Sequence, residues 1–201
     1  MSEIIVPMTG VQTENFANID FVFLDRDGVL NRSLLGDYVT CWEKFEILPG
    51  VELAISSINR SGRKTIVVTN QRGIALGLHS EASLFDMHDR LRQHLAQHGA
   101  HLDAIYYCPH DHGQCHCRKP QTGMFEQAFR DFPSATARNS VMVGDSLVDI
   151  EAASRLGMRS VFLADPKGPR KPDADRAAAL ATACASSLRD FVERYLEGRS
   201  Q

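Results

Sequence analysis

Short apolar runs that end in polar residues recur along the chain. The first run, IDFVFL at 19–24, is followed at once by charged residues. Four more runs are as short and as rich in branched or aromatic side chains, at 65–69, 104–108, 141–144 and 160–164. Such runs are typical of strands that are buried on both faces of a sheet. We therefore expect five strands at these positions.

Segments with helical periodicity or helix-end residues lie between these strands. The pattern predicts helices at 51–60, 80–98, 122–131, 147–156 and 188–196. Glycines end three of them, and the last has an apolar face formed by Leu188, Phe191, Val192, Tyr195 and Leu196. The segment 165–178 carries Pro, Gly and charge, so we expect an exposed, solvated loop there, including its cations Lys167, Arg170 and Lys171.

The alternation of strands and helices predicts the fold class. Strands separated by helices form a parallel sheet with helices on both faces, which is a Rossmann-like α/β fold. The apolar pattern starts at residue 19. We therefore expect an N-terminal extension at 1–18 and a single domain at 19–201.

Composition excludes several classes of protein. The chain has 201 residues, 43% of them hydrophobic, which suits one globular domain with a core. A net charge of −3 gives no basic footprint for nucleic acid. No stretch approaches the roughly 18 consecutive apolar residues of a membrane span, and the N-terminus lacks the pattern of a secretory signal. We expect a cytoplasmic monomer that binds neither nucleic acid nor membrane.

Polar residues gather where the predicted strands end. Asp25, Asp27, Thr69, Asn70 and Asp145 each stand at, or just after, the end of a predicted strand. Any one of them could merely begin a turn. Ligands of parallel sheets bind at the carboxyl ends of the strands, so five such groups on three strands predict one common crevice.

The spacing of the first two aspartates indicates a metal site. Residues i and i+2 of an extended chain point the same way, so Asp25 and Asp27 can face one ligand while Arg26 faces away. Close carboxylates repel unless a cation sits beside them. Asp145 adds a third carboxylate, and such a set of oxygens suits Mg²⁺. Asp149, one helical turn further on, is placed to support the site from outside.

The stretch CPHDHGQCHCRKP predicts a second metal site. Three thiolates and one imidazole make a closed tetrahedral set of the kind that holds structural Zn²⁺, and they are supplied by Cys108, His110, Cys115 and Cys117. His112 and His116 are weaker candidates, and the alternative is a Cys-rich solvent loop. The zinc loop, 108–117, leads directly into Arg118 and Lys119, whose positions a bound metal would fix.

Four motifs in order, DRDGVLN, VVTNQ, CRKP and VGDSLVDIEAA, resemble those of the haloacid dehalogenase superfamily of phosphatases over residues 19–165. The resemblance implies that Asp25 is the nucleophile, which becomes an aspartyl-phosphate, and that Asp27 is the acid and base. It also implies that Thr69 and Lys119 hold the phosphoryl oxygens. Mg²⁺ would be held by Asp25, the Asp27 carbonyl and Asp145.

The zinc loop resembles two branches of that superfamily, the D-glycero-D-manno-heptose-1,7-bisphosphate 7-phosphatases and the histidinol-phosphate phosphatases. The segments IYYCPH, CRKPQTGM and GDYV favour the heptose branch, which implies removal of the 7-phosphate. The matching substrate-binding positions are Gly36, Asp37, Tyr38, Asn70, Gln71, Arg72 and Arg118. The chain departs from the pattern at Arg72 and Leu76, in TNQRGIALG where TNQSGIARG is usual, and at Ser146, where lysine is usual.

Other functions remain as alternatives. The chain could be a histidinol-phosphate phosphatase or another small-molecule phosphatase. It could also be a mutase. Mutases of this superfamily, however, carry a helical cap, and the segment between Asp27 and Thr69, residues 28–68, leaves little room for one. We therefore expect hydrolysis and no large cap domain. A zinc-binding interaction module without activity is the non-enzyme alternative, against which the complete set of catalytic residues argues.

Overall fold

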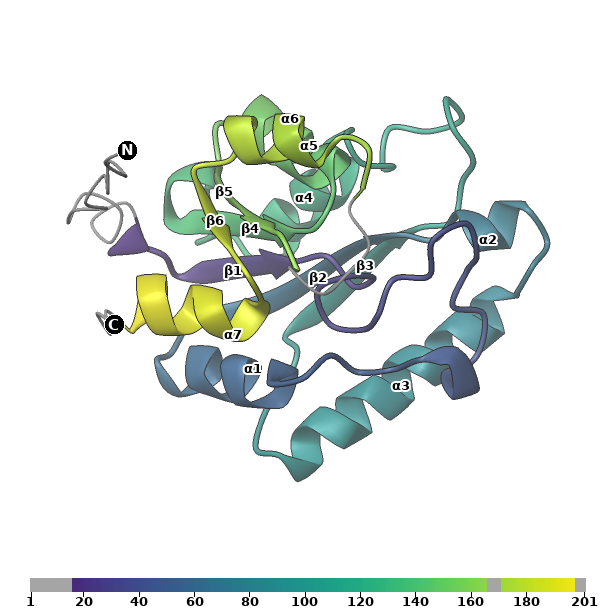
Figure 1. Cartoon of the computed structure of the whole chain (residues 1–201), viewed down its shortest axis with the longest axis horizontal. Coiled ribbons are helices and arrows are strands. Elements are labelled where there is room, and N and C mark those ends of the chain that lie inside the picture. The colour runs from purple at the N-terminus through teal and green to yellow at the C-terminus, as the bar shows by residue number, and fades with distance from the viewer. Residues whose placement is uncertain (1–15, 166–170, 198–201) are drawn as a thin grey trace, which may run out of the picture.

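One β-sheet runs through the middle of the molecule (Figure 1). The computed structural model describes residues 16–165 and 171–197. Six parallel strands pair there in the order β3-β2-β1-β4-β5-β6. Their bounds are β1 Phe21–Leu24, β2 Lys64–Asn70, β3 Ala104–Cys108, β4 Ser140–Gly144, β5 Arg159–Leu163 and β6 Ala183–Ala185. Because every pair is parallel, the carboxyl ends of the strands lie at one edge of the sheet.

Helices cover both faces of this sheet (Figure 1). One face carries α1 Val51–Arg60, α3 Glu81–Gln97 and α7 Leu188–Phe191, and the other carries α4 Gly123–Asp131, α5 Leu147–Leu156 and α6 Ala174–Leu180. The remaining short elements are η2 Trp42–Lys44, α2 Arg72–Ala75, η3 Ala137–Asn139 and η4 Val192–Leu196. The described segments between the strands contain no further folded unit that could act as a cap.

The side chains of β1 explain why its sequence is apolar throughout. Val22 and Leu24 pack into the core that includes α1, α3 and α7, whereas Phe21 and Phe23 pack into the core that includes α4 and α5. Successive side chains of a strand point to opposite faces. Both faces of this strand are covered, so both sets of side chains are buried and no polar alternation appears.

The helix ends follow from local sequence. The Ser80 side chain accepts a hydrogen bond from the Ser83 N–H and so begins α3. Ser146 and Asp149 form a reciprocal capping box that begins α5 next to the end of β4. Gly157 ends α5 at φ 66°, a conformation that glycine adopts without steric cost. The cap of α5 places Asp149 and Asp145 beside each other.

The five expected strands and five expected helices are all present, and the α/β fold class without a large cap is confirmed. The expectation of an exposed loop over 165–178 is wrong for its second half, because α6 begins at Ala174. Ala177 is fully buried against Ile150 and Phe162. The small residues of α6 let it pack closely against the sheet, but they give no periodic apolar pattern in the sequence. The short strand β6 was not predicted for the same reason. Lys167 and Arg170 lie outside the described residues.

The segment before β1 contributes to the core where it is described. Phe16 is 1% exposed, and its ring lies 5.8 Å from that of Phe191 and 5.2 Å from that of Tyr195. Residues 1–15 of the expected N-terminal extension lie outside the described part, so the domain boundary at 18 stays a prediction.

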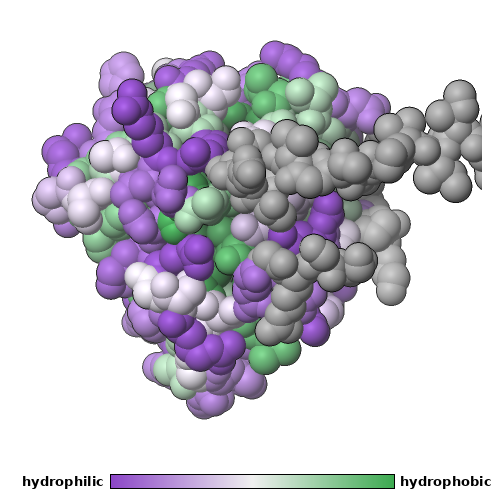
Figure 2. Space-filling model, turned by 90° about the vertical axis from the view of Figure 1, so that its left-hand side faces the viewer, coloured by the Kyte–Doolittle hydropathy of each residue, from purple (hydrophilic) through white to green (hydrophobic). Residues whose placement is uncertain are grey.

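The surface is mainly polar where it is described. Figure 2 shows one face on which hydrophilic residues predominate and hydrophobic residues form small groups. Among the described residues, no helix combines the length and the apolar character that a membrane crossing requires.

Replacing Phe125 by alanine tests the core between β1 and α4. The Phe23 and Phe125 rings lie 5.4 Å apart and both side chains are fully buried. We expect Phe125→Ala to lower the free energy of unfolding by about 3–5 kcal/mol, because the lost ring leaves a cavity. The matched control, Phe85→Ala, removes a ring that is 46% exposed and should cost about 1 kcal/mol or less. Urea unfolding measures both, and equal losses would contradict the assignment.

Candidate active site

The strand ends bring the sequence motifs to one edge of the sheet. Asp25 directly follows β1, and its N–H donates to the carbonyl of Val143 in β4, 3.0 Å away. Thr69 is the second-last residue of β2, and Asp145 directly follows β4. The backbone ladder thus fixes Asp25 next to the end of β4. The residues expected to share one crevice are thus brought to the same edge of the sheet, where Asp145 lines a cavity.

Lys119 is the cation at the centre of this edge. Its ammonium lies 2.9 Å from Asp25 Oδ1, 2.6 Å from Asp149 Oδ1 and 2.7 Å from the carbonyl of Val68. The side chain is 1% exposed. Burial lowers its pKa, but the two carboxylates outweigh burial and hold the pKa above the usual lysine value. Lys119 is therefore a fixed positive charge with all three N–H donors engaged.

Asn70 holds the backbone of Lys119 in place. Its amide Nδ2 donates to the Lys119 carbonyl at 3.0 Å, and its Oδ1 accepts from the Lys119 N–H at 2.9 Å. This reciprocal pair joins β2 to the segment that follows the cysteine cluster. Asn70 was expected to contact substrate, and that role stays a prediction beside the structural one.

Asp27 is held by three side chains. Both of its oxygens accept from Nη2 of Arg26 at 2.9 Å, while Asn31 and Gln71 donate at 2.9 and 3.0 Å. Burial raises the pKa of Asp27, but the charge and hydrogen bond of Arg26, with the other two bonds, hold the pKa below its usual range. The expectation that Arg26 simply faces away is wrong. Arg26 is buried and donates to Asp27, and among the described residues no other cation pairs with that carboxylate.

Gln71 also connects Asp27 to Thr69. The Gln71 amide donates to Thr69 Oγ1 at 2.8 Å as well as to Asp27. Thr69 is 1% exposed. A hydroxyl that accepts one bond keeps its own hydrogen to donate, so Thr69 is prepared to meet an anionic oxygen.

Three carboxylates form an oxygen-rich group that fits a divalent cation. Ligand atoms of Asp25, Asp145 and Asp149 lie within 4.8 Å of one another, and Asp145 Oδ1 is buried without a hydrogen-bond partner. Burial raises the pKa of Asp25 to about 7 and that of Asp145 to about 6, although Lys119 and Lys171 oppose it. A hard cation would offset this crowding of negative charge.

Two of these acids have distinct surroundings. Asp149 is fully buried, and its Oδ2 accepts from the N–H and hydroxyl of Ser146, so it braces the group from within α5. Asp145 lies against Gly28, where a Cβ would come within 1.7 Å of Asp145 Oδ2. Gly28 also has φ 93°. Only glycine fits this position, for both reasons.

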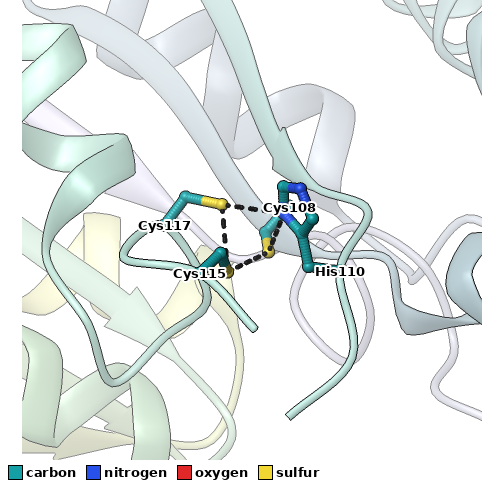
Figure 3. A group of neighbouring side chains, drawn as sticks. All are labelled: Cys108, His110, Cys115 and Cys117. Atoms are coloured by element: carbon teal, nitrogen blue, oxygen red, sulfur yellow. Dashed lines mark hydrogen bonds between the residues drawn. The ribbon is translucent and has the colours of Figure 1, made fainter. Parts of the chain in front are cut away.

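The cysteine cluster predicted from the sequence is assembled (Figure 3). The Cys117 and Cys115 sulfurs lie 3.3 Å apart, those of Cys108 and Cys115 3.5 Å apart, and His110 Nδ1 lies 3.6 and 3.3 Å from the Cys108 and Cys117 sulfurs. Zn–S bonds of about 2.3 Å and a Zn–N bond of about 2.0 Å place tetrahedral ligand atoms roughly 3.5–3.8 Å apart. The arrangement fits such an ion. His112 and His116, the weaker candidates, are not part of the group.

The cluster is tied to Lys119 through the neighbouring residue, Arg118. Cys115 Sγ accepts from the backbone N–H of Arg118 at 3.3 Å, and Arg118 Nη1 lies 3.5 Å from the carbonyl of His110. Arg118 Nε is buried without a hydrogen-bond partner. The zinc loop therefore sets the backbone just before Lys119 and leaves a guanidinium donor unsatisfied.

The other expected substrate-binding residues are only partly brought together. Arg72 pairs with Asp111 of the zinc loop, at 2.5 and 3.3 Å, and shares a side-chain hydrogen bond with Tyr38. Asp37 is instead 60% exposed and pairs with Lys44 at 3.2 Å. Gly36 has φ 75° and forms the preceding turn. Arg72 and Tyr38 thus border the zinc loop, whereas Asp37 faces Lys44.

Lys171 is a site residue that the sequence analysis missed. It was assigned to a solvated loop, but its ammonium lies 2.7 Å from Asp145 Oδ2 and its side chain is only 27% exposed. No motif marks it. The available signal was its place after a predicted strand, β5, whose carboxyl end lies at the same edge as those of β1 and β4.

Comparisons with known proteins agree with this geometry. A family model described as HAD-hydrolase-like matches residues 116–191. The D-glycero-β-D-manno-heptose-1,7-bisphosphate 7-phosphatase of Vibrio cholerae is 40% identical over 183 residues, which cover 87% of this chain and 95% of that protein. The corresponding α-D-manno enzyme of Mycobacterium bovis is 42% identical over 133 residues, covering 66% and 70%.

A solved structure is similar over nearly the same extent. The D,D-heptose 1,7-bisphosphate phosphatase of B. bronchiseptica, complexed with magnesium and phosphate, has a TM-score of 0.78 and 30% identity. The match covers 90% of this chain and 100% of that one. With this identity, this coverage and the same motifs on the same fold, the chain belongs to the heptose-1,7-bisphosphate 7-phosphatase family of haloacid dehalogenase-like hydrolases.

Proposed function

We propose that this protein is a Mg²⁺-dependent phosphatase that removes the 7-phosphate of D-glycero-D-manno-heptose 1,7-bisphosphate. The observation that carries the proposal is the buried Asp25–Lys119 pair, which lies beside Asp145 at the carboxyl edge of the sheet. A carboxylate held by a fixed cation in this position is suited to attack phosphorus. Relatives that carry this activity in their names support the choice of reaction.

In the first step, a carboxylate oxygen of Asp25 attacks phosphorus while the bond from phosphorus to the sugar oxygen breaks. Asp25 Oδ1 is held by the Arg26 N–H at 2.8 Å and by Lys119, so the nucleophile is oriented before substrate arrives. Asp27 gives a proton to the departing alkoxide. The pKa of Asp27 is low in the free protein, and the negative charge of a bound phosphate ester favours the protonated form that this step needs.

In the second step, a water molecule attacks the aspartyl-phosphate. Asp27 takes the water proton, the bond between phosphorus and Asp25 breaks, and inorganic phosphate leaves with Asp25 restored. In both steps the positive charge of Lys119 stabilises the phosphoryl oxygens, and the Thr69 hydroxyl donates to them. Asp25, Asp145 and the Asp27 carbonyl would hold Mg²⁺, which would further neutralise the phosphoryl charge.

The cysteine cluster is assigned a structural Zn²⁺. Cys108, His110, Cys115 and Cys117 would supply all four ligands of a tetrahedral site, which would leave no position for a reacting water. The hydrogen bond from the Arg118 N–H to Cys115 would then hold the backbone of Arg118 and Lys119 in a fixed position. Zinc would thus affect catalysis only by fixing the positions of these residues.

A second phosphate on the substrate requires its own cation. Lys119 is occupied by the phosphoryl group that is transferred, and Arg118 is the next cation along the chain, with a buried Nε lacking a partner. Its fork suits phosphate oxygens. Arg72 borders the same loop through Asp111. We assign the remote phosphate to Arg118 and leave the anomer to assay, since named relatives include both α and β enzymes. The cytoplasmic location and monomeric state stay predictions.

Substitution of the two aspartates tests the chemistry. Asp25→Asn should abolish turnover because it removes the nucleophile, and Asp27→Asn should lower kcat by about 10²–10⁴-fold. Asp86→Asn, at an exposed pair on α3, is the matched control and should leave kcat unchanged. Phosphate release is measured with and without Mg²⁺. Substantial Mg²⁺-dependent turnover by pure Asp25→Asn protein would refute the covalent mechanism.

Removal of one thiolate tests the zinc site. We expect one zinc per chain, and Cys115→Ser should lower both zinc content and melting temperature, because metal binding is coupled to folding of the loop. Activity should fall with them, since Arg118 loses its anchor. Cys184→Ser changes an exposed free thiol and serves as control. Elemental analysis and thermal melting provide the readouts, and zinc-free protein directly after purification would overturn the assignment.

Substitution of the two neighbouring cations tests the substrate. A charge-assisted contact is worth roughly 1.5–3 kcal/mol, so Arg118→Ala should lower kcat/KM for the bisphosphate by about ten- to a hundredfold. It should barely affect an aryl phosphate, whereas Lys119→Ala should damage both. Steady-state kinetics are compared for both heptose anomers, an aryl phosphate and histidinol phosphate. A preference for histidinol phosphate, or an equal loss on all substrates in Arg118→Ala, would contradict the proposal.

A further inference from the structure

Lys171 makes an ion pair that the mechanism above does not use. Its ammonium reaches Asp145 Oδ2 at 2.7 Å from the segment that precedes α6. The Asp145 side chain is 12% exposed, and burial raises the pKa of this carboxylate although Lys171 opposes it. The pair therefore lies inside the site and is not a solvated surface contact.

Charge balance explains why Asp145 needs this partner. Asp25, Asp145 and Asp149 crowd together within 4.8 Å, and Lys119 serves only two of them. The third N–H of Lys119 is taken by the carbonyl of Val68. Asp145 is left to Lys171, because a carboxylate buried beside two others is costly without a cation.

A divalent cation would change this balance. Three carboxylates against Lys119 and a dication are neutral, which leaves the charge of Lys171 unopposed within the group. An ammonium at Asp145 Oδ2 and a cation at the unpartnered Oδ1 would share the single negative charge of that carboxylate, which weakens the attraction between Asp145 and Lys171. Loading the metal would therefore free Lys171 to meet another anion.

Space for that exchange is present. A cavity of about 450 Å³ opens at Asp145 and Gly28, and Lys171 lines it together with Phe162 and Leu163. A lysine ammonium on its flexible four-carbon stem can leave Asp145 and turn within such a cavity. The anion that reaches this edge in a phosphatase is the phosphoryl group.

We propose that Lys171 is an exchangeable counter-ion, which neutralises Asp145 in the metal-free protein and binds the phosphoryl group once Mg²⁺ is in place. The inference rests on the proposed phosphatase chemistry and is independent of which sugar carries the phosphate. It assigns two roles to Lys171: neutralising Asp145 in the metal-free protein, and binding phosphate in the Mg²⁺-loaded protein.

Lys171→Met removes the charge and keeps most of the side-chain volume. In Mg²⁺-free buffer its melting temperature should fall below that of wild type, and saturating Mg²⁺ should abolish the difference. Calorimetry should show Mg²⁺ binding about tenfold more tightly, because the competing ammonium is gone, and inorganic phosphate binding to the Mg²⁺-loaded protein about tenfold more weakly. Lys171→Arg keeps the charge and should retain the wild-type melting temperature in Mg²⁺-free buffer.

The matched control is Lys64→Met. Lys64 pairs with Asp103 at 2.8 Å, at the opposite edge of the sheet, and should change neither affinity. A melting deficit in Lys171→Met that is equal with and without Mg²⁺ would mean a purely structural role and would overturn the proposal. Unchanged Mg²⁺ or phosphate affinity would overturn it as well. None of these measurements uses a sugar, so a wrong heptose assignment would leave them unaffected.

Discussion

The site depends on one buried cation, the ammonium of Lys119. It lies between Asp25 and Asp149 and also takes the carbonyl of Val68, so all three of its hydrogens are used inside the protein. In a poorly solvated interior, two neighbouring carboxyl groups repel each other less when such a charge lies between them. The rest of the edge is arranged around this constraint: Asn70 grips the lysine backbone, and Ser146 holds Asp149 in place.

The cysteine cluster makes that position reproducible. Lys119 follows a loop rather than a strand, and loops are the less rigid parts of a fold. Cys115 binds the Arg118 N–H, and the cluster gathers the loop onto Cys108 at the end of β3. The edge strand and the loop are thus joined into one support. This explains how a chain without a cap domain can hold a lysine with little freedom.

Two separate ion pairs hold the first two aspartates at this edge of the sheet. Arg26 fixes Asp27, and Lys119 fixes Asp25, so the two carboxylates that the mechanism uses have separate cations. Burial raises the pKa of both carboxyls, but at Asp27 the charge of Arg26 and the donated hydrogen bonds outweigh it, whereas at Asp25 neighbouring acids add to burial and exceed the effect of Lys119. In the proposed mechanism, acid–base catalysis and nucleophilic attack are carried out by two aspartates that lie only two residues apart.

The sequence alone determined the strand ends, the acidic motif and the four members of the cysteine–histidine cluster, because these depend on local periodicity and on spacing within a few residues. Only the tertiary structure decided the roles of Arg26 and Lys171. Their side chains are long and flexible, and their partners are chosen by which carboxylate is buried nearby. The same holds for α6 and β6, whose small residues are buried by neighbours distant in sequence. The local sequence pattern indicates which face of a helix or strand is apolar. Which buried charges pair with each other depends on contacts between segments that are distant in the sequence.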